Sequence, residues 1–112
     1  MSMESRPPKI ERRSHDRVVK RMPVRVRSSH GSIEESAHTR DVSSNGVFLY
    51  TQSRMVEGSE VELVLILPSE LTAGEKCWVC CHAEVLRVES GGERFGVAAK
   101  IRRIDVLPEV SI

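Results

Sequence analysis

The sequence predicts an all-β domain, a small antiparallel barrel or sandwich. Several short segments alternate apolar and polar residues with a period of two, which is typical of half-buried strands. Glycine, asparagine and proline turn signals separate these segments, and no stretch keeps a helical period over three turns. The 112 residues are enough for one domain with a single modest core. A content of 39% hydrophobic and 29% charged residues is typical of globular proteins.

The first part of the chain reads as an arm followed by two strands. Residues 1–11 contain prolines and serines without an apolar period, and we expect a flexible N-terminal arm. Residues 18–27 are expected to form a strand, because valines interleave with Arg25 and Arg27, and Pro23 indicates an edge or a bulge in it. A strand at residues 39–41 leads into the turn at residues 43–46, whose Asn-Gly pair predicts a tight turn with positive φ.

Four further strands bring the expected total to six, and the short Gly/Asn turns between them favour antiparallel pairing. Residues 90–93 form a hairpin loop, and a weak helical turn is expected at residues 69–71. Residues 104–112 contain a proline and β-branched residues, and we expect no stable helix there. The four strands are predicted at residues 47–50, 60–67, 78–88 and 94–101.

The charge is unevenly distributed along the chain. The formal net charge is +1, yet residues 1–30 carry nine basic and three acidic residues, a net charge of +6. Residues 31–112 therefore carry −5. A basic arm before an acidic body favours an anionic partner.

Composition also excludes several classes of protein. No apolar run is long enough for a membrane span or for the core of a signal peptide. Three clustered cysteines do not make a disulfide framework, so a reducing cytoplasm is the expected location. The presence of only four aromatic residues weighs against a single-strand nucleic-acid binder, which needs aromatic side chains on which bases stack.

Two short motifs together carry the functional signal. The first is Arg-x-x-x-Arg, with Arg13 and Arg17 spaced by four after a further arginine, Arg12. The second is Asp-x-Ser-x-x-Gly at residues 41–46, at the end of the second expected strand. The two motifs, in this order and in this strand context, resemble those of the PilZ family. The resemblance covers about residues 11–104 and includes the strand with Gly96.

This resemblance implies a six-stranded antiparallel PilZ-type β-barrel with little or no C-terminal helix. Residues 1–11 would be the flexible basic arm, residues 12–104 the PilZ domain and residues 105–112 a C-terminal tail. A helix often packs over one open end of such barrels, and we expect none here. Either the short C-terminal tail or a second chain would then close that end, and exposed apolar surface there would favour a homodimer.

The resemblance also implies a ligand, the bacterial second messenger cyclic di-GMP, a dianion with two guanine bases. Arg13 and Arg17 would bind phosphate and guanine, because a guanidinium both forms paired hydrogen bonds and stacks on a purine. Asp41 would accept from guanine N–H donors, and Ser43 would offer a hydroxyl to the same site. Gly46 would let the backbone turn where a Cβ would clash.

Arg12 bears on the number of ligand molecules that each site would bind. In the PilZ family an arginine at this position goes with an intercalated ligand dimer, whereas a bulky apolar residue goes with one molecule. We therefore expect two cyclic di-GMP molecules per site. The arm would order over the ligand on binding.

The segment at residues 77–82, Cys-Trp-Val-Cys-Cys-His, raises a metal or redox alternative. No second Cys/His pair completes a zinc site, and haem attachment needs histidine directly after the second cysteine of the pair. On a strand, Cys77 and Cys81 would point to one face and Cys80 and His82 to the other. We expect buried core cysteines and no metal, no cofactor and no enzymatic activity.

A receptor of this size is expected to act on a downstream protein in trans. One alternative is a PilZ-fold protein-interaction adaptor that does not bind nucleotide; the complete motifs weigh against it. Another is a barrel that binds RNA or DNA through its basic arm, against which the acidic body and scarce aromatic residues weigh.

Overall fold

Alternation of branched apolar residues with polar ones folds the chain into seven β-strands. The structure, a computed structural model, describes residues 17–28, 33–67, 72 and 77–107, and this part of the chain contains no helix. The strands are β1 (Val18–Val19), β2 (Pro23–Ser28), β3 (Glu34–Val42), β4 (Gly46–Thr51), β5 (Glu60–Leu67), β6 (Cys77–Gly91) and β7 (Arg94–Val106).

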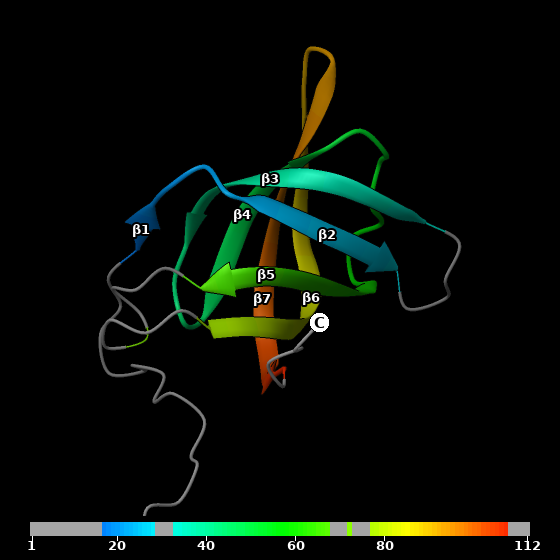
Figure 1. The fold of residues 1–112 in the computed structure, drawn as a ribbon. Helices are drawn as coiled ribbons and strands as arrows, with labels where there is room; N and C mark the ends of the chain where they lie inside the picture. Colours follow the sequence, from blue (N-terminus) through cyan, green and yellow to red (C-terminus); the bar gives the residue numbers. More distant parts are fainter. Residues whose placement is uncertain (1–16, 29–32, 68–71, 73–76, 108–112) are drawn as a thin grey trace, which may run out of the picture.

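Six of the strands form a closed antiparallel barrel, which confirms the predicted fold class. The strand order is β1-β3-β2-β5-β6-β7-β4, and an additional pairing of β4 with β3 closes the ring (Figure 1). The seventh strand, β1, pairs with β3 beyond the end of β2, opposite Asp41 and Val42. The hairpin of β6 and β7 projects beyond the other strands (Figure 1).

The barrel interior is filled by aliphatic side chains from alternate strand positions. Along β5, Val61, Leu63, Leu65 and Leu67 are at most 3% exposed, whereas the residues between them are half-buried. Similar alternation in β2, β6 and β7 brings valine, alanine and cysteine side chains into the same core. This single core packs together the strands that carry the sequence motifs and the remaining strands of the barrel.

The strand expected at residues 18–27 is divided in two. Thr39 on β3 lies opposite the break, and its Oγ1 donates to the carbonyl of Lys20 at 2.6 Å and accepts from the Met22 amide at 3.0 Å. These bonds replace the strand ladder where the chain bends, and β2 then starts at Pro23. Proline has no amide hydrogen to donate, but the bend has already interrupted the ladder at this point, so Pro23 costs no further hydrogen bond there.

Register shifts typical of β-bulges interrupt the regular alternation at three places. They leave one extra residue each in β3, β6 and β7, namely Arg40, Leu86 and Arg102. All three side chains are exposed. A bulge places two consecutive side chains on the same side of a strand, so these positions add groups to the outer face of the barrel.

The C-terminal part of the domain departs from the expected boundaries. Strand β7 continues to Val106 because it pairs with the first half of β6, where Asp105 lies opposite Cys80. Residue 105 therefore belongs to the barrel, not to a separate tail. The helical turn expected at residues 69–71 and the arm at residues 1–11 lie outside the described residues. Among those that are described, no helix is long and apolar enough to cross a membrane.

Candidate ligand-binding site

The centre of the candidate site is an ion pair between the two sequence motifs. Arg17 Nη1 lies 3.1 Å from Asp41 Oδ1, and Asp41 is 5% exposed. The pairing of β1 with β3 brings these residues together, because Arg17 directly precedes β1 and Asp41 faces Val19 across the ladder. Asp41 Oδ1 makes no well-aligned hydrogen bond within the described part of the chain. This oxygen is buried next to Arg17, so a ligand N–H group could reach it only if the surrounding side chains moved.

A second arginine, Arg40, holds the other oxygen of the same carboxylate. Its Nε donates to Asp41 Oδ2 at 2.7 Å, and its Cζ lies 3.8 Å from the centre of the Phe48 ring. The hydrogen bond to Asp41 raises the pKa of Arg40, which is charged at all physiological pH values. Sequence reasoning missed this residue, because Arg40 lies outside both motifs and regular alternation predicts opposite faces for Arg40 and Asp41.

The turn of the second motif is organised by Ser43. Its hydroxyl accepts from the amides of Asn45 at 3.2 Å and Gly46 at 3.1 Å, and the Ser43 amide donates to the Gly46 carbonyl at 2.8 Å. The serine thus closes a local turn and also lines the candidate site. The Asn45 carbonyl accepts from the amide of Ile101 at 2.8 Å, which fixes the turn against β7.

Gly46 is required by close packing and not by its backbone angle. Positive φ among the described glycines occurs at Gly58 and Gly92, so the expectation of positive φ is wrong for Gly46. A Cβ on Gly46 would lie 3.1 Å from the Ala99 carbonyl oxygen and 3.3 Å from Arg17 Nη2. The absence of a side chain therefore leaves room for the Arg17 guanidinium beside the turn.

These residues border a shallow basic depression of about 590 Å³ on the outer face of β4, β6 and β7. Its cations come from four separate segments: Arg17, Arg40, Arg87 and Lys100. Its floor includes small residues, Gly46, Ala98 and Ala99. Among its described lining residues no carboxylate is present, so the depression favours an anion, although residues 31–112 are acidic as a whole.

The predicted site residues are only partly brought together in the described structure. Arg17, Ser43 and Gly46 line this depression, and the buried Asp41 is joined to it through its ion pair with Arg17. Arg12 and Arg13 lie outside the described residues. Arg87, Lys100 and the 55%-exposed Leu86 were not identified from the sequence, because they depend on how β6 and β7 pair with β4.

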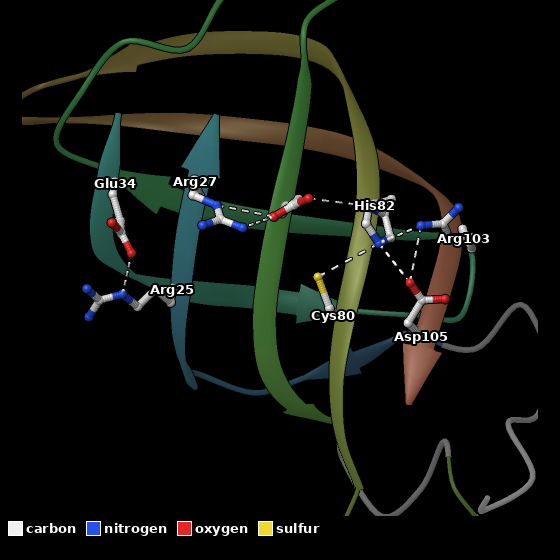
Figure 2. A network of polar contacts seen from close by, with 8 residues as sticks. Arg25, Arg27, Glu34, Cys80, His82, Arg103 and Asp105 are labelled. Carbon is white, nitrogen blue, oxygen red and sulfur yellow. Dashed lines mark hydrogen bonds and ion pairs between the residues drawn. The ribbon is translucent and has the colours of Figure 1, made fainter. Parts of the chain in front are cut away.

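A separate polar network lies on the outer face of β2, β5, β6 and β7 (Figure 2). His82 Nε2 lies 2.9 Å from Asp105 Oδ2 and 3.1 Å from Arg103 Nη2, so it can donate to the first or accept from the second, but not both. Glu62 receives two hydrogen bonds from Arg27, which lower the pKa of this carboxyl group. Each charge in this network already has a partner, and we assign it a structural role.

The cysteines divide between the two faces of β6 as alternation predicts. Cys77 and Cys81 are buried in the core, and burial raises the pKa of Cys81 to about 12. Cys80 lies on the outer face, with Sγ 3.9 Å from His82 Nε2, and partial burial raises its pKa too. No cluster of three or more His, Cys, Asp or Glu side chains in the described residues could hold a metal ion.

Comparisons with known proteins agree with this architecture. Two solved structures share the fold. The PilZ domain of CeSA from a cellulose-synthesizing bacterium has 21% identity and a TM-score of 0.57, over 79% of this chain and 81% of that one. The Bacillus subtilis inhibitor of motility, MotI/DgrA, has 18% identity and a TM-score of 0.66, and the match covers 86% of this chain but only 45% of MotI.

Comparison with curated protein sequences gave no significant match. A scan of protein-family profiles matches the PilZ domain over residues 11–109. This range contains both motifs, the ion pair that joins them and all seven strands. The chain therefore belongs to the PilZ domain family.

Proposed function

We propose that the protein is a cyclic di-GMP receptor that binds its ligand in the basic depression beside the Arg17–Asp41 ion pair. The observation that supports this most directly is the buried Asp41 carboxylate, whose Oδ1 faces Arg17 without a well-aligned hydrogen bond. A guanine N–H donor would supply that bond once the surrounding side chains move. The surrounding cations would neutralise the two phosphates of the ligand.

The remaining motif residues have complementary roles in this proposal. Arg13 and Arg17 bind phosphate and guanine, while Ser43 keeps the turn in shape and offers its hydroxyl at the rim. Gly46 leaves space between the turn and the guanidinium of Arg17. In this proposal the protein binds its ligand and catalyses no chemical step.

The N-terminal arginines would complete the site from above. We propose that the segment with Arg12 and Arg13 orders over the ligand, so part of the binding free energy is used for folding. Arg12 favours an intercalated dimer of cyclic di-GMP. Isothermal titration checks the ratio: two ligands per chain are expected for the native protein and fewer for Arg12→Leu, and a native ratio near one overturns the dimer.

The output is proposed to be a contact with a partner protein in the cytoplasm of a bacterium. One structural neighbour is named an inhibitor of motility, so that protein is named for a regulatory role. Co-purification with and without cyclic di-GMP would identify proteins whose binding depends on the ligand.

The alternative is an adaptor barrel that binds proteins without nucleotide. Trp78 favours this alternative, because it is 53% exposed on β6, does not line the basic depression, and large exposed aromatic residues are enriched at protein interfaces. Self-association through apolar surface remains a prediction, checked by sedimentation with and without ligand.

Titration distinguishes these proposals. The native protein is titrated with cyclic di-GMP and, in parallel, with single-stranded oligonucleotides. Binding of cyclic di-GMP is expected at micromolar ligand and should be lost in Arg13→Ala and Arg17→Ala. Arg25→Ala is the matched control, because it removes an equal charge from an exposed ion pair with Glu34 outside the depression. Failure of the native protein to bind supports the adaptor, and preference for the oligonucleotides supports a nucleic-acid binder.

A further inference from the structure

We infer that Arg40 is a further ligand-binding arginine, on whose flat guanidinium one guanine base of the ligand stacks. This inference rests on the proposed function, because it assigns a contact within the same depression. Arg40 belongs to neither Arg-x-x-x-Arg nor Asp-x-Ser-x-x-Gly. Its assignment comes from the geometry of β3 and β4.

Two contacts fix the plane of this guanidinium before any ligand arrives. The hydrogen bond from Nε to Asp41 Oδ2 at 2.7 Å holds one edge, and the Phe48 ring lies 3.8 Å from Cζ. Phe48 is itself immobilised, with 5% exposure and its ring against Gly96. A side chain held in this way loses little conformational freedom when a ligand binds.

The opposite face of the Arg40 guanidinium is open to the depression. The side chain is 52% exposed and lines the same cavity as Arg17. It points outward because Arg40 is the extra residue of the β3 bulge, which places it next to Asp41 on the outer face. A flat base can therefore lie over Arg40, beside the ion pair of Asp41 with Arg17.

Planarity, and not charge alone, is the property that this position offers. A guanidinium between an aromatic ring and a purine stacks on both of its faces, whereas a lysine ammonium supplies only a point charge. Arg40→Lys therefore separates the two contributions. Arg40→Ala removes both, and it also leaves Asp41 with Arg17 as its remaining cationic partner.

The test measures cyclic di-GMP affinity by isothermal titration for the native protein, Arg40→Lys and Arg40→Ala. We expect Arg40→Lys to weaken binding about tenfold, the size of a lost base-stacking contact. Arg40→Ala should weaken it at least as much. The matched control is Arg54→Lys, because Arg54 also lies over a phenylalanine, 6.0 Å from the Phe95 ring centre, but does not line the depression.

The outcomes separate this inference from the proposed function. If the native protein does not bind cyclic di-GMP, the proposed function fails and the stacking contact fails with it. If the native protein binds and Arg40→Lys binds equally well, only the stacking role is overturned. Equal melting temperatures of the native protein and Arg40→Lys show that the folded barrel is retained. Should Arg40→Lys unfold, Phe48→Leu serves instead, with weaker binding expected because the support beneath the guanidinium is reduced.

Discussion

The guanidinium of Arg17 lies 3.1 Å from the carboxylate of Asp41, although the two residues are separated by the whole of β2 and most of β3. The short strand β1 creates this contact by pairing with the last residues of β3. One residue of each sequence motif thereby takes part in a single ion pair. The stability of that contact and its use by a ligand can be measured separately.

Removing either partner of this ion pair should cost modest stability and most of the ligand affinity. Arg17 is 46% exposed, so solvent screening limits the coupling free energy with Asp41 to about 1 kcal/mol. A double-mutant cycle with Arg17→Ala and Asp41→Asn, followed by urea denaturation, measures it. The exposed pair of Arg25 and Glu34 is the reference cycle, for which a smaller value is expected. Coupling no larger than that of the reference would contradict the role of the ion pair.

Replacing Gly46 by alanine should weaken ligand binding without unfolding the protein. The new Cβ would lie 3.1 Å from the Ala99 carbonyl oxygen, which the β4–β7 ladder holds in place, so Arg17 must move away from the turn. We expect a loss of stability of about 1 kcal/mol. Gly91→Ala is the control, because nothing lies within 4 Å of its Cβ position. The same binding affinity in both variants would argue against tight packing at Gly46.

Gly96→Ala should destabilise the barrel more strongly. Its Cβ would lie 2.7 Å from Cζ of Phe48, closer than van der Waals contact allows, so the buried ring must shift. Overpacking of this kind costs about 1–3 kcal/mol. Chemical denaturation of the single variant and of Gly96→Ala combined with Phe48→Leu checks the cause. The smaller leucine should restore part of the loss, and no restoration would place the strain elsewhere.

Alkaline pH should destabilise the folded protein through Cys81. Burial raises its pKa from 9.0 to about 12, so above pH 9 the unfolded chain loses a proton that the folded chain retains. The stability contributed by the neutral thiol is therefore present below pH 9 and falls between pH 9 and 12, by at most about 1.4 kcal/mol per pH unit. Urea denaturation from pH 8 to 11 should show a shallower decline for Cys81→Ala. Parallel declines would show that Cys81 ionises as readily in the folded state.

Acidification should act on a different face, through Glu62. The two hydrogen bonds from Arg27 lower the pKa of this carboxyl group below 4.5. Its contribution to stability is therefore present above pH 4.5 and is lost as the pH falls through the lower folded-state value. Glu62→Gln should flatten the acid limb of the stability curve. Glu93→Gln at the exposed hairpin tip should leave that limb unchanged.

The regular parts of the barrel could be predicted from the sequence, because alternation is a local pattern. Residues 60–67 were predicted as a strand and form β5 with the same bounds. The opposite faces of Cys80 and Cys81 also follow from alternation alone. Alternation does not predict where a bulge or a bend interrupts a strand.

The missed features all depend on pairing between distant strands. The bend between β1 and β2 is held by Thr39, which is about twenty residues away in the chain. The role of Arg40 depends on a register shift against β4, and Lys100 reaches the depression because it lies opposite Gly46. No local pattern encodes these relationships, so the sequence predicts one of the four described cations that line the depression, Arg17, and not the other three.

The three bulges add residues to the outer surface of the barrel and leave the direction of the core side chains unchanged. On either side of Arg40, Thr39 and Val42 are buried, while Asp41 faces the site. Without the extra residue, the order of inward and outward side chains would be that of a regular strand. Chain length at such a point can therefore change by one residue while every core side chain keeps its direction. The barrel has places where a binding surface can gain or lose a group without repacking its interior.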